Sequence, residues 1–206
     1  MDENLKMILE KTRELTFKYG IKGVTFDKIC EDLNITKTQF FTYIKDEKDL
    51  VEKVLDLERE GFKEIFINYD FEGKNAIDIL LTVSKEVGEK FRYITPANTF
   101  ELKKYYPEIY QKHFEERIEF IFGKIQINIQ KGINQGMYRE DLSIELIARL
   151  YISRLIDVHN TDIFPPDKYS FEVIFEVMFE NFVRSIAKPE GIKYFEKRKK
   201  LKKYNV

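Results

Sequence analysis

The chain has 206 residues, 43% hydrophobic and 34% charged, which is typical of a folded globular protein and excludes a disordered one. One cysteine excludes an intrachain disulfide framework and predicts a reducing cytoplasm as the setting. No run of about 18 apolar residues occurs, and the acidic N-terminus is unlike a signal peptide, so neither a membrane segment nor export is expected.

The first 50 residues predict three helices. Apolar residues recur at helical spacing over residues 3–19, and Gly20 ends that helix. Two short helices follow at residues 26–33 and 37–43, with Thr25 and Thr36 as N-caps. Asn34 lies between them, and Asn tolerates the left-handed backbone of a sharp turn. This pattern is that of a helix-turn-helix.

The second short helix has the side chains of a DNA-reading element. Phe40 and Ile44 face inward, which leaves a polar set outside. In a helix-turn-helix the N-terminal residues of this helix meet base edges, so Thr38 and Gln39 are expected to read bases. Gln can bond an adenine edge through both of its amide atoms. Lys37, Tyr43 and Lys45 are expected to contact phosphates.

The stretch from residue 24 to 50, VTFDKICEDLNITKTQFFTYIKDEKDL, resembles the N-terminal domain of the TetR (tetracycline-repressor-like) family. Two departures matter: Phe41 lacks the hydroxyl of the usual Tyr, and Glu47 stands where a phosphate-binding Lys is usual. Lys45 and Lys48 are the candidates to compensate. The resemblance and the residue pattern together give the expected DNA-binding set: Thr25, Thr36, Lys37, Thr38, Gln39, Phe41, Thr42, Tyr43, Lys45 and Lys48.

Charge weakens this reading. Residues 1–50 contain nine Lys or Arg and ten Asp or Glu, so the proposed DNA-binding part is not basic overall. We therefore expect modest affinity that depends strongly on a dimer.

The rest of the chain is also predicted to be helical. Amphipathic patterns cover residues 48–69, 75–93, a short stretch from Pro96, 108–135, a segment capped by Ser143, and 168–187. The expected fold is all-α, with a DNA-binding domain at 1–50, a helical effector-binding and dimerisation domain at 51–190, and a basic tail at 191–206. The tail is interpreted as a solvated helix end; the alternative is an extra phosphate or membrane-surface contact.

Residues 168–187 are apolar on nearly every side, so more than one face must be covered. A second copy of the chain is the simplest cover, and the TetR resemblance also implies pairing through a four-helix interface. The expected dimer interface is Ile152, Leu155, Ile156, Phe175, Met178, Phe179 and Phe182.

The chain holds 18 Phe and 12 Tyr, most of which we expect to fill a helical core. Some could line an apolar pocket for a small molecule between helices. The candidates are Phe62, Phe66, Phe91, Phe100, Tyr110, His113, Phe114, Arg117 and Tyr151.

Catalytic and metal chemistry have no support in the sequence. His113 and His159 fall on different predicted helices without ligand partners at metal-site spacing, and no nucleotide loop or nucleophile motif occurs. Cys30 is expected to be a buried thiol. No enzyme activity, cofactor or metal is expected.

The sequence therefore predicts a homodimeric repressor that binds double-stranded palindromic DNA and is released by a small apolar or aromatic effector. The alternative is a helical small-molecule carrier or protein-interaction module in which the helix-turn-helix is only a structural corner. Three features favour that alternative: the near-neutral charge of residues 1–50, Phe41 and Glu47.

Overall fold

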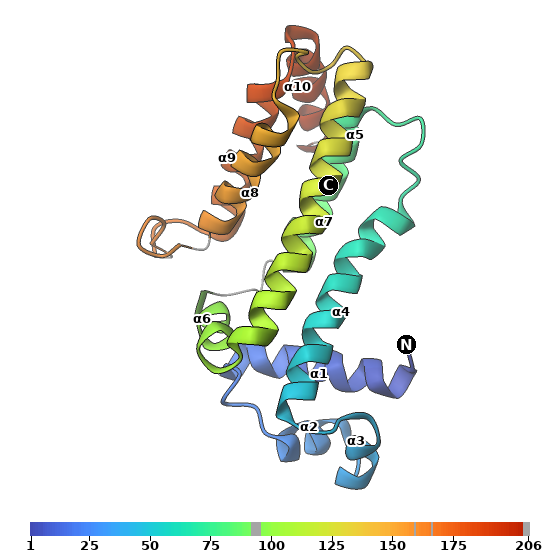
Figure 1. Cartoon of the computed structure of the whole chain (residues 1–206), viewed down its shortest axis with the longest axis vertical. Coiled ribbons are helices and arrows are strands. Elements are labelled where there is room, and N and C mark those ends of the chain that lie inside the picture. Colours follow the sequence, from blue (N-terminus) through green and yellow to red (C-terminus); the bar gives the residue numbers. More distant parts are fainter. Residues whose placement is uncertain (92–95, 159, 166, 204–206) are drawn as a thin grey trace. The chain divides into compact units, whose positions relative to one another are not determined.

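A computed structural model describes residues 1–91, 96–158, 160–165 and 167–203, although the side chains of residues 90, 91, 96, 97 and 201–203 are not described. Within these residues the chain forms ten α-helices and no strand (Figure 1). The only pairing of β type found there is an isolated bridge between Tyr138 and Ala187. The all-α prediction is confirmed.

The chain divides into two compact units. The first comprises residues 1–64 and 93–117, and the second comprises residues 65–92 and 118–206. Helices α4 (Glu47–Asn68) and α7 (Pro107–Asn134) each contribute to both units. The units therefore differ from the predicted division at residue 50, because the first unit also takes in most of α4 and a later segment of the chain.

The first unit begins with α1 (Glu3–Tyr19), α2 (Phe26–Leu33) and α3 (Lys37–Tyr43), at the boundaries that the sequence predicts. Asp2 caps α1, since its carboxylate accepts from the backbone N–H of Asn4 and of Leu5. The cluster of buried apolar residues comprises Ile8, Leu9, Leu15, Ile29, Cys30, Phe40, Ile44, Leu50 and Val54. It joins α1, α2, α3 and the start of α4, and α6 (Pro96–Tyr105) completes this unit with the first part of α7.

The second unit contains α5 (Ala76–Phe91), α8 (Ile144–Asp157), α9 (Phe171–Ile186) and α10 (Pro189–Lys203). Helix α9 begins three residues later than predicted, because the hydroxyl of Ser170 caps it by accepting from the N–H of Val173. Ser143 stands at the N-cap position of α8, but its side chain makes no capping bond. Helix α5 packs against α9 and α10.

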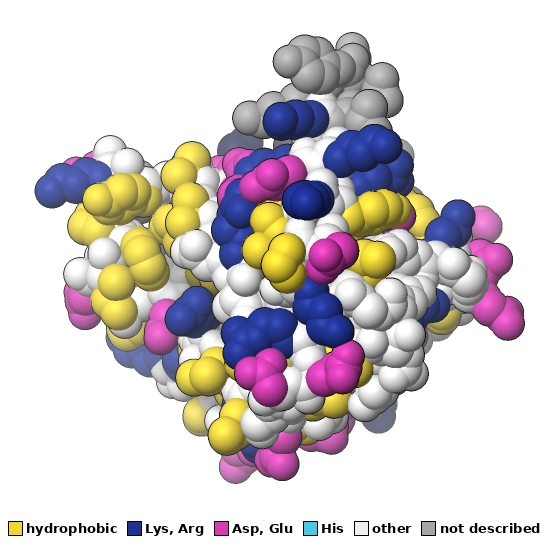
Figure 2. All heavy atoms as spheres, turned by 90° about the horizontal axis from the view of Figure 1, so that it is seen from above, with side chains coloured by type: hydrophobic (Ala, Val, Ile, Leu, Met, Phe, Trp, Pro, Cys, Tyr) yellow, Lys and Arg dark blue, Asp and Glu magenta, His cyan; other side chains and the backbone are white. Residues whose placement is uncertain are grey.

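The basic tail is a packed helix within the second unit. Asp78 of α5 accepts hydrogen bonds from the hydroxyl of Tyr194 and from Nε of Arg198, both at 2.6 Å. Lys199 pairs with Glu176 and Glu180 of α9. Lys193, Lys197 and Lys200 stay exposed. In Figure 2 basic and acidic side chains lie intermingled on the face of the molecule shown.

Candidate nucleic-acid interface

The turn between α2 and α3 forms as the sequence predicts. The hydroxyl of Thr25 accepts from the N–H of Lys28 and caps α2. Asn34 adopts a left-handed conformation, with φ 52° and ψ 44°, which lets the chain reverse without glycine. The N–H of Ile35 then donates to the carbonyl of Cys30 at 3.0 Å and closes the turn.

One face of helix α3 is buried in the core of the first unit, and the other face is exposed to solvent. Phe40 and Ile44 are completely buried, and truncation of a buried Phe typically costs about 3–5 kcal/mol. Phe41 is 45% exposed, yet its ring packs edge-on against Phe26 and Phe40 with centroids 5.4 Å away. The exposed residues on the other side are Lys37, Thr38, Gln39 and Thr42. A rigid core thus presents a polar helix face to solvent.

The N-terminus of α3 carries a capping box. Oε1 of Gln39 accepts from the backbone N–H of Thr36 at 2.8 Å and from its hydroxyl at 3.0 Å. In return, the Thr36 hydroxyl accepts from the N–H of Gln39 at 3.2 Å. Thr36 and Thr25 therefore use their hydroxyls as helix caps, and half of the Gln39 amide is engaged within the chain.

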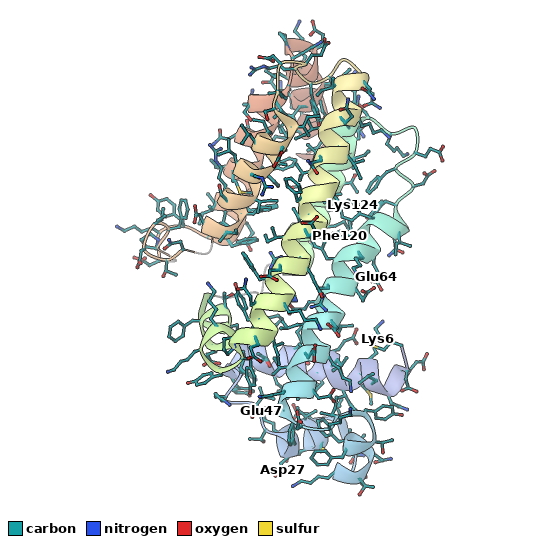
Figure 3. All side chains as sticks on the ribbon, viewed as in Figure 1. Lys6, Asp27, Glu47, Glu64, Phe120 and Lys124 are labelled. Atoms are coloured by element: carbon teal, nitrogen blue, oxygen red, sulfur yellow. The ribbon has the colours of Figure 1, made fainter. Side chains whose placement is uncertain are left out.

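Lys37 has an acidic partner on the same surface. Its Nζ lies 2.6 Å from Oδ1 of Asp27, a residue of α2 that Figure 3 labels. The hydrogen bond to Asp27 raises the pKa of Lys37. Both side chains are exposed, so salt screens the pair and a phosphate can compete for the lysine.

Tyr43 and its neighbours line a surface hollow. The hydroxyl of Tyr43 accepts from Nδ2 of Asn4 at 3.2 Å, and the hydroxyl of Thr42 donates to the carbonyl of Thr38. Tyr43, Asn4, Thr42 and Gln39 border a hollow of about 170 Å³ between α1 and α3. Asn4 was missed by sequence reasoning, because nothing in its local sequence places it beside a residue 39 positions later. Lys45 and Lys48 are exposed.

Glu47 stands at the start of α4, labelled in Figure 3, and its charge is compensated within the chain. Nζ of Lys22 lies 3.0 Å from its carboxylate and 3.3 Å from the hydroxyl of Tyr106. Hydrogen bonds from Tyr106 and then Lys22 hold the pKa of Glu47 below its usual value. Lys22 and Tyr106 were also missed by sequence reasoning, since only the fold brings them to Glu47.

A pocket of about 80 Å³ lies within the first unit, between α1, α4 and α6. Its apolar wall includes Phe17, Leu50, Val54 and Leu102, and Arg13 and Glu58 also line it. Burial raises the pKa of Glu58, against the opposing charges of Arg117 and Arg13. None of the nine ligand candidates from the sequence lines this pocket.

Those nine candidates are divided between the two units. Phe62, Phe100, Tyr110, His113, Phe114 and Arg117 belong to the first unit, and Phe66, Phe91 and Tyr151 belong to the second. Phe100 is 64% exposed, and the side chain of Phe91 lies outside the described residues.

Four of the candidates pack against aromatic rings. Phe66 contacts Phe120 at 5.5 Å between centroids, with Nζ of Lys124 over both rings; Phe120 and Lys124 are labelled on α7 in Figure 3. Tyr110 stacks on Phe114 within α7, and Tyr151 packs on Phe182. Their role in ligand binding stays a prediction.

His113 is buried, with Nδ1 3.2 Å from Nη1 of Arg59. Burial and the nearby charges of Arg117 and Arg59 lower its pKa to about 4, so the ring is neutral at pH 7. His159 lies outside the described residues. In the described part of the chain no group of three potential metal ligands comes together.

Cys30 is a buried residue of α2, and burial raises the pKa of its thiol. It is therefore a protonated core side chain near neutral pH.

Most of the expected dimer interface is already buried within one chain. Ile152, Phe175, Met178, Phe179 and Phe182 are all less than 10% exposed, so a partner has little of their surface left to cover. The reason is that α8 and α9 pack on each other, and α9 also packs on α5. Leu155 is half-buried and Ile156 is exposed. The exposed apolar residues of these two helices include Leu146, Leu150, Val173 and Val177.

No protein-family model and no curated protein matches the sequence. The fold, however, matches solved structures over most of the chain. A transcriptional regulator from Cytophaga hutchinsonii ATCC 33406 is 21% identical, with a TM-score of 0.72 over 91% of this chain and 100% of that one. A TetR-family transcriptional regulator from Cytophaga hutchinsonii is 17% identical, with a TM-score of 0.69 over 90% and 96% of the two chains.

A transcriptional regulator from Saccharomonospora viridis, solved in complex with choline, is 15% identical, with a TM-score of 0.71 over 91% and 100%. The chain thus has the fold of TetR-family transcriptional regulators. Within the described residues, no helix is both long and apolar enough to cross a membrane.

Proposed function

We propose that this protein is a dimeric DNA-binding transcriptional repressor that a small effector releases from a palindromic operator. The observation that carries the proposal is the α2–α3 unit, in which buried Phe40 and Ile44 fix a helix whose other face is polar and exposed. A fixed helix of this kind in a helix-turn-helix is suited to enter a major groove. The regulators that share the fold support the proposal.

The effector would act at a site from which a helix movement is transmitted to α2 and α3. The pocket between α1, α4 and α6 is a candidate for its site, because α1 and α4 also supply the core beneath α3. At about 80 Å³ it is smaller than the roughly 150 Å³ cavity that accepts benzene. The pocket is also open on one side, and we expect an effector larger than benzene to displace one of these helices rather than project from that opening. The choline complex of the Saccharomonospora viridis regulator supports small-molecule binding by this fold.

Release requires that the effector bind the displaced state more tightly than the DNA-competent one, because equal affinity shifts no equilibrium. An effector that binds tightly and leaves operator affinity unchanged would contradict this mechanism.

The test of DNA binding is selection of bound duplexes from a random library at about 150 mM salt, where non-specific phosphate binding is weak. We expect a near-palindromic site with half-sites one helical turn apart, or a multiple of that distance. If the protein is folded and nothing is enriched, the carrier or interaction module is the better description. Two ion pairs within residues 1–50 favour the carrier or interaction module: Asp27 pairs with Lys37, and Lys22 pairs with Glu47.

A further inference from the structure

The orientation of the Gln39 amide is fixed by its partner. The atom that faces the backbone N–H of Thr36 must be an acceptor, because a backbone N–H only donates. That atom is therefore Oε1, and it also accepts from the Thr36 hydroxyl. Both capping bonds of the side chain use the oxygen. Nε2, with its two hydrogens, is the end of the amide that the capping box leaves for a ligand.

We propose that Gln39 reads the operator as a donor only, and that it selects guanine rather than the adenine that a free glutamine prefers. Guanine presents two neighbouring acceptors, N7 and O6, in the major groove. Adenine and thymine present one acceptor each, and cytosine presents a donor. An amide nitrogen with two hydrogens therefore finds its best match in guanine. This inference rests on the proposed DNA-binding function and names the base that one residue of it recognises.

Reading adenine through both amide atoms would require Gln39 to give up Thr36. Oε1 would have to turn from the N–H and the hydroxyl of Thr36 to the amino group of adenine. The Thr36 hydroxyl would still cap α3 through the N–H of Gln39, but the bonds to Oε1 would be lost. Loss of one hydrogen bond typically lowers an equilibrium constant by about fivefold, so adenine carries a penalty that guanine does not. The capping box thus acts as a specificity device, because it commits one half of the amide before DNA arrives.

The experiment compares the full-length wild type with Gln39→Glu in the same selection at about 150 mM salt. Glutamate keeps the capping box, since its carboxylate accepts from Thr36 as well as an amide oxygen does, but it has no donor. We expect guanine in the wild-type site at one symmetry-related pair of positions. There, exchange of guanine for adenine should weaken binding about tenfold. Gln39→Glu should lose that preference and shift it toward cytosine, whose amino group can donate to a carboxylate.

Two controls separate this effect from charge and from folding. Gln130→Glu makes the same charge change on α7, at an exposed residue outside the proposed interface, and should leave the selected sequence unchanged. The melting temperature of Gln39→Glu should match that of the wild type, because the cap is retained. In the wild-type site, 7-deazaguanine at the selected position should weaken binding, because it lacks the N7 acceptor.

Other results overturn the inference in distinguishable ways. Adenine at the position whose preference depends on residue 39 would show that the capping box opens on DNA. An identical selected sequence for wild type and Gln39→Glu would show that Gln39 reads no base. In both cases the protein would still be a specific DNA binder. The absence of any enriched sequence for the wild type would instead overturn the proposed function and this inference together.

Discussion

The imidazole of His113 is a buried group that the fold keeps neutral. It lies between α4 and α7 with Nδ1 3.2 Å from the Arg59 guanidinium. Burial, followed by the charges of Arg117 and Arg59, lowers its pKa from 6.5 to about 4. Protonation would place a further charge in a site that already holds two guanidinium groups. His113 is therefore a point at which acid should destabilise the first unit.

The sign of the pH effect follows from which state binds the proton first. Between pH 6.5 and 4 the unfolded chain protonates this histidine and the folded chain does not, so stability falls as pH falls through that window. The whole pKa shift of His113 corresponds to about 3 kcal/mol in the free energy of unfolding. The measurement is the free energy of unfolding by urea at several pH values, for the wild type and for His113→Gln.

Carboxylates also titrate in this range, and the raised pKa of Glu58 works in the opposite direction. They are present in both proteins, so the difference between the two curves isolates the histidine. We expect the variant to lose less stability between pH 6.5 and 4. Parallel curves would mean that His113 takes up a proton in the folded state as readily as in the unfolded chain.

At the scale of elements, the end of α7 is locked by Tyr138. Its completely buried ring packs on Gly132, where a Cβ would lie 2.0 Å from the ring. The hydroxyl donates to Oδ1 of Asn128, and Nδ2 of Asn128 donates to the carbonyl of Ala76 at the start of α5. One glycine, one tyrosine and one asparagine therefore hold α7, the following turn and α5 together.

Gly132→Ala should destabilise the protein, by about 1–3 kcal/mol or more, because the ring and the backbone must both shift to admit a methyl group. Gly123→Ala is the matched control on the same helix, since a Cβ there meets no atom within 4 Å. It should be neutral or stabilise by up to about 1 kcal/mol through helix propensity alone. Urea unfolding measures both. Similar free energies for the two variants would show that Tyr138 moves aside at little cost.

Helices are the level at which the sequence is most informative here. Apolar spacing, Thr25, Asn34 and Thr36 act within a few residues of each other, so α1, α2 and α3 could be predicted to the residue. The start of α9 could be predicted less well. The apolar pattern does not show whether the helix begins at residue 168 or after Ser170. The capping box could be recognised as a T-x-x-Q pattern, but its consequence for the Gln39 amide needed the observed bonds.

At the scale of the whole molecule, the residues that sequence reasoning missed are those joined by the fold alone. Glu47, Lys22 and Tyr106 come from three separate segments, and no local pattern links them. The dimer residues show the same limit. A helix that is apolar on many sides was predicted to need a partner chain, yet α5 and α8 of the same chain cover much of α9. Periodicity identifies an apolar face but does not identify what covers it.

The apolar surface left on α8 and α9 defines a narrower prediction for dimerisation. Leu146 and Leu150 are one helical turn apart on α8, and Val173 and Val177 are one turn apart on α9. Each is more than half exposed. Exposed large apolar side chains at this spacing on two neighbouring helices are typical of a helix-packing surface. We therefore expect them, together with Ile156, to meet the same surface of a second copy.

Leu150→Asp should convert the dimer to a monomer. A two-fold axis would bury one new carboxylate from each copy in the interface, and neither carboxylate would have a basic partner there. Ile127→Asp is the control: Ile127 is 64% exposed on α7, compared with 57% for Leu150, and lies outside the proposed surface. Sedimentation equilibrium should give a monomer for the first variant and a dimer for the second. Circular dichroism would then show whether the monomer keeps its helices. A palindromic operator needs two linked α3 helices, so a folded monomer should also lose specific DNA binding. If the Leu150→Asp protein instead stays dimeric, the dimer interface lies elsewhere.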